Sequence, residues 1–207
     1  MISIITPSIR PQYLDITQRT LEAQTFKDFE WLVDVGLHTE GFTLPKAFNR
    51  LIRAAKGDTI VILQDCISIP EDALERISHL PLEKKAYTFP VVIEGRKDWR
   101  SHSFGVRQLT PNQWEIDFAV APRDMFYDVG GFDEAFCDGW GWDNVELGWR
   151  AGAAGYDFLS SDATHGDAID HDKLIEHPFR NKLKNNDWRA EETRWKAAHG
   201  DYKLNFL

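Results

Sequence analysis

Cysteine is scarce in this chain of 207 residues. The two cysteines, Cys66 and Cys137, lie in contexts typical neither of a disulfide framework nor of a zinc site, which favours a reducing compartment. No apolar run approaches the ~20 residues that a membrane-spanning helix needs. The opening segment lacks the basic leader and the cleavage site of a signal peptide. These absences predict a cytoplasmic protein with no integral membrane segment.

Positive charge is also limited. The formal net charge is -9, and no large basic block is present. This balance opposes non-specific binding to nucleic-acid phosphates, although the cationic stretch 177–184 leaves a local basic groove open. Tryptophan, by contrast, is abundant, with eight residues. Tryptophan side chains often either fill a core or stack on a ligand.

Strand and helix signals alternate through the first 80 residues. The apolar, β-rich segments 2–6, 31–33 and 59–63 are each followed by a helical pattern. Further strands are expected at 86–93, 114–120 and 156–159, and a further helix at 145–153. The alternation predicts an α/β fold, a Rossmann-like, mostly parallel sheet with helices on both faces. We expect one domain over 1–207, with 1–94 as its nucleotide-binding half and 95–207 as its acceptor half and tail.

Polar residues follow the first three predicted strands. They are Thr6, Pro7 and Ser8, then Asp34, then Gln64 and Asp65. Because ligands bind beyond the carboxyl ends of parallel strands, we expect these residues to share one rim of the sheet. Asp65 is placed to hold a divalent ion that bridges two phosphates. A turn or a helix cap before Pro70 explains the same aspartate equally well.

A segment rich in glycine and tryptophan dominates the second half. It reads Gly-Gly-Phe-Asp-Glu at 130–134 and Gly-Trp-Gly-Trp-Asp-Asn-Val-Glu-Leu at 139–147. Asp143 and Glu146 are three residues apart, so both can lie on one face of a helix start. A capping box explains the two acids, but not the glycines and tryptophans before them. We therefore favour a functional site, with the flat tryptophan rings against a sugar.

Histidines follow the last predicted strand, and they are His165, His171 and His177. A neutral imidazole can complete a metal site begun by Asp65. A solvated loop histidine is the plain alternative for each of them.

These segments together resemble the family 2 glycosyltransferases of the GT-A fold. The resemblance rests on Ile-Ile-Thr-Pro-Ser at 4–8, Ala-Gln-Thr-Phe-Lys-Asp-Phe-Glu-Trp at 23–31, Lys-Ala-Phe-Asn at 46–49 and Ala-Lys-Gly-Asp at 55–58. It is completed by the blocks at 130–134 and 140–147, which resemble a galactosyltransferase-like "GGFDE" and "GWGGEDVDL". The matches keep the family's order over about residues 2 to 172.

The resemblance implies a role for each matching position. Thr6, Pro7, Ser8 and Arg10 would line the nucleotide pocket, with Asp34 on the base or ribose and Lys46, Asn49 and Gln64 nearby. Trp140, Trp142 and Asp143 would face the sugar and the acceptor. Asp65 would bind Mn²⁺ or Mg²⁺ with His171, or with His165 as the less favoured choice. The donor implied is a nucleoside diphosphate-sugar, a UDP-sugar foremost.

The sequence departs from the family's pattern at three positions. Leu63 stands where the first acid of the Asp-x-Asp motif is expected, and Val35 follows Asp34 in place of a second acid. Asn144 stands where the family has its usual base. An amide cannot accept the proton, so the base would be Asp143, or Glu146 in a shifted geometry.

The sequence therefore predicts a metal-dependent, inverting sugar transfer. Two other classes stay open: an inactive nucleotide-sugar-binding or scaffold domain, motivated by Leu63 and Asn144, and a nucleotidyltransferase. The latter usually has a glycine-rich phosphate loop, which 6–10 lacks. The acceptor is left open among a glycan, a protein, a metabolite and a modified nucleobase in DNA, and the oligomeric state is left open as well.

Overall fold

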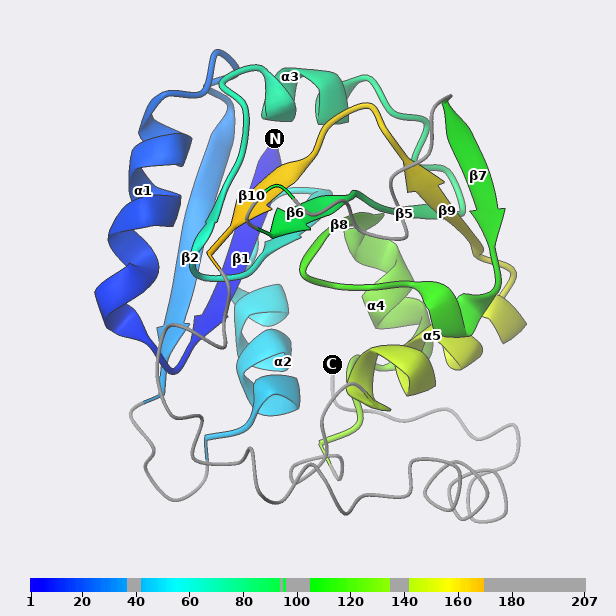
Figure 1. Cartoon of the computed structure of the whole chain (residues 1–207). Coiled ribbons are helices and arrows are strands. Elements are labelled where there is room, and N and C mark those ends of the chain that lie inside the picture. The colour runs from blue at the N-terminus through cyan, green and yellow to red at the C-terminus, as the bar shows by residue number, and fades with distance from the viewer. Residues whose placement is uncertain (37–41, 94, 96–104, 135–141, 170–207) are drawn as a thin grey trace.

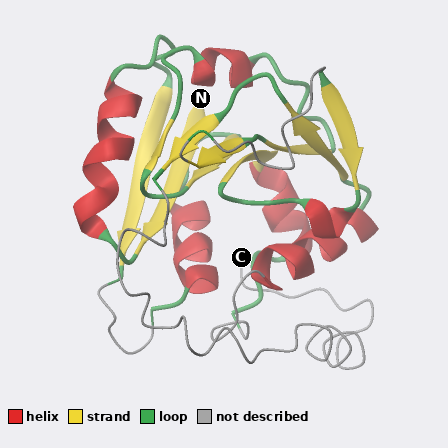
Figure 2. Ribbon diagram, viewed as in Figure 1, coloured by secondary structure: helices red, strands yellow, loops and turns green. Residues whose placement is uncertain are grey.

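The computed structural model describes residues 1–36, 42–93, 95, 105–134 and 142–169. Seven strands form the main sheet, in the order β2-β1-β3-β8-β5-β9-β7 (Figures 1 and 2). Their bounds are β1 Ile2–Ser8, β2 Phe29–Val35, β3 Thr59–Leu63, β5 Lys85–Thr88, β7 Val106–Leu109, β8 Phe118–Pro122 and β9 Asp157–Ser161. Only β8 and β7 pair antiparallel to their neighbours, so the described sheet is mostly parallel by strand direction.

Helices cover both faces of this sheet, as the sequence predicts. They are α1 Leu14–Glu22, α2 Leu44–Ala54, α3 Ala73–Ser78, α4 Arg123–Val129 and α5 Trp142–Ala153. Apolar residues of α2, α4 and α5 form one buried cluster with Ile5, Ile60 and Ile62. Residues of α1 and α3 form the other cluster, with Ile4 and Val61. Alternate residues of β1 and β3 thus enter opposite cores, as expected for strands buried on both faces.

Three further short strands form a second sheet, β4-β10-β6, with bounds Ile67–Ser68, Gly166–Ala168 and Val91–Ile93. The single strand expected at 86–93 is in fact two strands, β5 and β6, that belong to different sheets. Pro90 lies between them and has no N–H to continue the first ladder. The strand expected at 114–120 begins later, at Phe118, after a 3-10 turn over Pro111–Gln113.

Strands from residues 1–94 and from residues 95–169 are interleaved in the main sheet, because β5 lies between β8 and β9. In the described part of the chain, the two proposed halves therefore both contribute to both buried clusters. No helix among the described residues is long and apolar enough to cross a membrane.

Candidate functional site

The polar ends of the first three strands do meet at one rim of the sheet. Pro7 of β1 is in register with Asp34 of β2, and the Gly36 N–H donates to the Ser8 carbonyl at 2.9 Å. On the other side, the Ser8 hydroxyl donates to a carboxylate oxygen of Asp65 at 2.6 Å. Residues nearly sixty positions apart in the chain are therefore in direct contact here.

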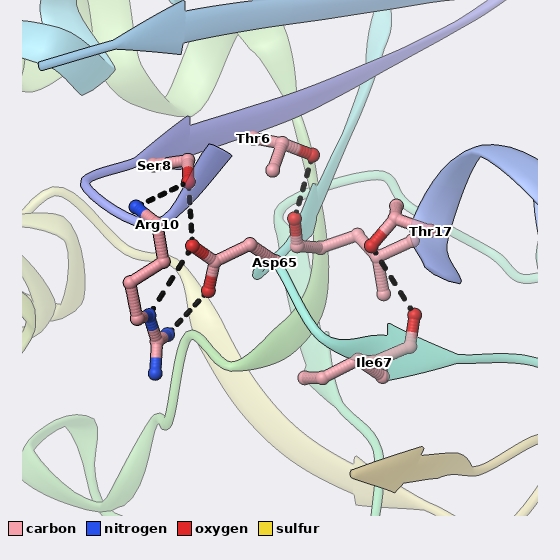
Figure 3. Close-up of polar contacts among 7 residues, drawn as sticks. Thr6, Ser8, Arg10, Thr17, Asp65 and Ile67 are labelled. Carbon is pink, nitrogen blue, oxygen red and sulfur yellow. Dashed lines mark hydrogen bonds and ion pairs between the residues drawn. The ribbon is translucent and has the colours of Figure 1, made fainter. Parts of the chain in front are cut away.

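Asp65 forms an ion pair with Arg10 at this rim (Figure 3). Arg10 Nη2 donates to Asp65 Oδ1, and Arg10 Nε lies 3.4 Å from Oδ2. The Asp65 side chain is 3% exposed and the Arg10 side chain 16%. A bidentate guanidinium thus occupies both carboxylate oxygens, and Ser8 adds a third donor.

The backbone around Asp65 is held in an unusual conformation. Cys66 has φ 66°, in the left-handed region that residues with a side chain rarely adopt. The Thr17 hydroxyl donates to the Ile67 carbonyl at 3.4 Å, and the Thr6 hydroxyl donates to the Leu63 carbonyl at 2.7 Å (Figure 3). Such strain persists only where surrounding contacts enforce it, and it is common at functional sites. Burial raises the pKa of the Cys66 thiol to about 12, so the thiol is protonated at neutral pH.

Within the described part of the chain, the donors around Asp65 do not fit a divalent ion. Mg²⁺ and Mn²⁺ require several oxygen or nitrogen ligands, and both Asp65 oxygens already accept from Arg10. Leu63, in place of the expected first acid, is fully buried in the apolar cluster of α1 and α3. Across the described ranges, no group of three or more His, Cys, Asp or Glu side chains is arranged to hold a metal.

The structure separates His165 from Asp65. In the antiparallel pair of β10 with β4, Asp167 is opposite Ser68 and Ala168 is opposite Ile67. Continuing this register places His165 beside Pro70, at the end of β4 away from Asp65. His165 Nε2 lies 3.7 Å from Asp167 instead, and half of its side chain is exposed. His171 and His177 lie outside the described residues.

The remaining nucleotide-site candidates divide into two groups. Asp34 forms a 2.6 Å ion pair with Arg50 on α2, while Lys46 and Gln64 are half-buried near the rim. Thr6 is fully buried, and its hydroxyl also accepts from Trp31 Nε1 at 3.0 Å. Thr6 therefore holds β1, β2 and β3 together, and its side chain does not face a ligand.

Asn49 has a role that the sequence reasoning missed. Its amide forms two bonds with Phe132, accepting from the backbone N–H at 2.9 Å and donating to the carbonyl at 2.9 Å. It also donates to Glu134 at 3.0 Å. Asn49 is buried, and these bonds fix the glycine-rich turn 130–134 against α2. Asn49, which was expected near the nucleotide, thus has a structural role that connects α2 to the turn 130–134.

Asp143 lies in the first turn of α5 and is only 7% exposed. Burial raises its pKa from 3.8 to about 6, although hydrogen bonds from the backbone at Asn144 and Asp143 partly oppose this shift. The carboxylate is therefore ionised at neutral pH and holds a proton below about pH 6. A proton affinity close to the working pH is what a general base needs.

Glu146, one turn further along α5, is fully buried and paired with Arg150. Both carboxylate oxygens accept from this guanidinium, which also donates to the Val129 and Gly131 carbonyls at 2.5 and 2.7 Å. The pair joins α5 to the end of α4. Its geometry favours a structural role for Glu146 and leaves Asp143 as the base candidate.

Asn144 also has an internal partner, the Trp114 carbonyl, to which it donates at 2.8 Å. The same segment reaches the rim, because the Asp117 carbonyl accepts from the Gln64 N–H at 2.9 Å. Residues 114–117 therefore connect the start of α5 with the end of β3. The charge of Asp117 contributes to the raised pKa of Cys66, so Asp117 is a further acid near the rim that sequence reasoning missed. Its position directly before an apolar strand was the available signal.

Of the two tryptophans expected to face the sugar, Trp140 lies outside the described residues. Trp142 begins α5, and its backbone alone is described.

Comparison with known proteins identifies structural neighbours only. No family model and no curated protein matches the sequence. The chain is similar in structure to residues 1–349 of S. aureus TarS, solved in complex with UDP-GlcNAc, with a TM-score of 0.66 and 15% identity over 85% of this chain. The complex of the same protein with UDP gives a TM-score of 0.62 and 16% identity over 81% of this chain.

The chain spans 60% of the length of these two neighbours. At such low identity the likeness establishes the fold alone, which is the α/β fold with a mostly parallel sheet that the sequence predicts. The galactosyltransferase-like reading of the C-terminal block stays a prediction.

Proposed function

We propose that this chain is a glycosyltransferase that moves a sugar from a nucleoside diphosphate-sugar, foremost a UDP-sugar, to an acceptor hydroxyl. The fold supports the class, and the TarS complexes contain UDP and UDP-GlcNAc. The observation that carries the proposal is the buried Asp143 carboxylate, with its pKa raised to about 6, at the start of α5. Residues 114–117 connect this helix start to the rim that carries Ser8, Arg10 and Asp65.

The donor site in this proposal is the rim itself. Ser8 and Arg10 offer a hydroxyl and a guanidinium beyond β1, and Asp34 and Lys46 flank them on the base and ribose side. Pro7 shapes the strand end, and Gln64 lies beside Asp65. Trp140 and Trp142 are proposed to pack on the sugar ring, because flat aromatic faces suit its apolar side.

The proposed reaction is a single displacement with inversion. The acceptor oxygen attacks the anomeric carbon while the bond from that carbon to the diphosphate oxygen breaks. The acceptor proton passes to Asp143, and the nucleoside diphosphate leaves with the electron pair of the broken bond. Because Asp143 is ionised above about pH 6, it can accept this proton at neutral pH.

The expected Mn²⁺ or Mg²⁺ ion, with Asp65 and His171 as its ligands, would neutralise charge on the leaving diphosphate. The described donors do not fit such an ion, and no step above requires one.

A thermal-shift panel of UDP-, GDP- and dTDP-sugars tests the donor class. A donor at 100 times its Kd adds about 2.7 kcal/mol to stability, a rise of roughly 5–10 °C for a chain of this size. We expect UDP-sugars to raise the Tm, and nucleotide release to follow when acceptors are added. A panel without any shift or turnover would reject the proposal. Binding without release across an acceptor screen would identify an inactive nucleotide-sugar-binding domain instead.

A further inference from the structure

Asp65 already holds a cation, the guanidinium of Arg10. The two side chains meet through two N–H groups of Arg10, and the ion pair is largely enclosed, with exposures of 16% for Arg10 and 3% for Asp65. In the GT-A resemblance, the equivalent aspartate is the residue expected to carry the metal. Two cations can therefore be assigned to this position, a divalent metal ion or the Arg10 guanidinium.

The pair is held in place by its own surroundings. The Ser8 hydroxyl donates to Asp65 and accepts from the Arg10 N–H at 3.0 Å, so three residues close a ring (Figure 3). The Arg10 carbonyl then accepts from the Tyr13 N–H at 3.0 Å, which begins the 3-10 turn before α1. Both the backbone and the side chain of Arg10 are thereby fixed at the rim.

Among the described residues, the two positions that were expected to complete a metal site with Asp65, Leu63 and His165, supply no ligand to it. The Leu63 side chain is apolar and fully buried, and its carbonyl already accepts from the Thr6 hydroxyl at 2.7 Å. His165 lies along β10, away from Asp65. Hard divalent ions need about six ligands, several of them from the protein or the phosphates. A fixed guanidinium needs only the one carboxylate that is present.

We infer that Arg10, oriented by Asp65, binds the donor diphosphate in place of a divalent ion, so that donor binding is independent of metal. This inference rests on the proposed function. A guanidinium has five N–H donors; the pair with Asp65 uses two, and the Cys66 side chain is also hydrogen-bonded to this guanidinium. N–H groups remain for a second anion. The pair is neutral overall, and its contribution is directed hydrogen bonds to the charge that builds on the leaving diphosphate.

Calorimetric titration of UDP into the wild-type protein provides the first test. One sample is treated with excess EDTA and one is supplied with Mn²⁺. We expect Kd values equal within about threefold, because the cation that contacts the phosphates belongs to the protein. A requirement for Mn²⁺ would overturn the inference and leave the proposed function standing. No binding of UDP or UDP-sugars in either sample would remove both.

Two variants test Arg10 itself in the presence of EDTA. Arg10→Lys keeps a positive charge beside Asp65 but loses the planar fork, and the double variant Arg10→Gln with Asp65→Asn keeps neutral hydrogen bonds without a buried charge. Each should weaken UDP binding by about 10- to 100-fold, the range expected for charge-assisted hydrogen bonds. Unchanged affinity in either variant would overturn the inference.

A matched control comes from the surface of α1, where Arg19 and Asp15 form an exposed ion pair at 2.7 Å. The double variant Arg19→Gln with Asp15→Asn makes the same chemical change away from the rim, and UDP affinity should stay within about twofold, because surface pairs contribute little. Circular dichroism and the Tm establish that each variant is folded.

The variant His171→Ala, measured with and without Mn²⁺, distinguishes the two cation assignments. Unchanged UDP affinity supports Arg10 as the cation, and a Mn²⁺-dependent loss of affinity overturns the inference.

Discussion

Helix α5 carries two buried carboxylates one turn apart, Asp143 and Glu146, and their surroundings differ in whether a cation is paired with them. Glu146 is enclosed with Arg150, which satisfies both of its oxygens and also bonds the Val129 and Gly131 carbonyls. Burial raises the pKa of Asp143, backbone hydrogen bonds partly oppose this shift, and no cation from the described residues contributes to it. Burial with a cation keeps a carboxylate charged and fixed, whereas burial without one raises its affinity for protons.

This difference in pairing supports a structural role for Glu146 and the proposed role of general base for Asp143. A fully buried carboxylate whose oxygens both accept from arginine is fixed in place and does not reach a substrate. A carboxylate buried without a cation gains a proton near neutral pH and can exchange it with a hydroxyl. The Asp65–Arg10 pair at the rim is intermediate, because its carboxylate is as buried as that of Glu146 but its arginine is partly exposed.

The largest expected effect is on turnover, in the variant Asp143→Asn. Loss of a general base reduces catalysis by about 10²- to 10⁴-fold, while UDP binding should be unchanged because the proposed diphosphate site is at the rim. The measurement is kcat together with a calorimetric Kd. Asp124→Asn is the matched control, since Asp124 occupies the first turn of α4 but is exposed. Turnover within tenfold of the wild type in Asp143→Asn would reassign the base.

The next largest effect is on stability, in the variant Arg150→Met. Glu146 would remain buried without its partner, which costs about 3–5 kcal/mol. Denaturant unfolding monitored by circular dichroism measures this loss. Arg19→Met provides the contrast, because Arg19 pairs with Asp15 at the same i,i+4 spacing on the surface, and about 0.5 kcal/mol or less is expected there. Equal losses in the two variants would contradict the assigned structural role.

The free energy of unfolding should also decrease as the pH rises, because of Asp143. Its pKa is raised in the folded state, so the fold binds the proton more tightly than the unfolded chain does. This contribution is fully present below about pH 4 and is lost as the pH rises to about 6. At about 1.4 kcal/mol per tenfold change in proton affinity, the loss is about 3 kcal/mol. The free energy of unfolding of Asp143→Asn, compared with the wild type from pH 4 to 7, should show the difference growing, with the variant more stable at pH 7.

The sequence predicts the fold well where local patterns are strong. The run Thr-Ile-Val-Ile-Leu matches β3 residue for residue, and the three polar strand ends meet at one rim. What the sequence does not reveal is which polar groups satisfy one another. Asn49 bonds a backbone 83 residues away, and Asp65 finds Arg10 at a separation of 55 residues. Such pairing depends on tertiary geometry, so a motif gives a residue's position and leaves its partner open.

The smallest predicted effect is on stability, in the variant Asn144→Asp. The contacts of Asn144 also account for an amide at a position where the resembled glycosyltransferases have an acid. Its amide donates to the buried Trp114 carbonyl, which an ionised aspartate cannot do. Asn144→Asp should therefore cost about 1–3 kcal/mol, the cost of a buried acceptor left without a donor. The deficit should shrink at low pH, where a protonated carboxyl can donate again.

The same substitution restores an acid where the family has one, so it tests whether position 144 can serve as a base in this protein. We expect turnover to fall or stay level, because the new carboxylate would face Trp114 and would stand beside the ionised Asp143. Asn112→Asp is the control, since Asn112 is exposed in the turn before Trp114 and should change stability by about 0.5 kcal/mol or less. A rise in kcat in Asn144→Asp would transfer the base assignment to this position and remove the contrast between Asp143 and Glu146.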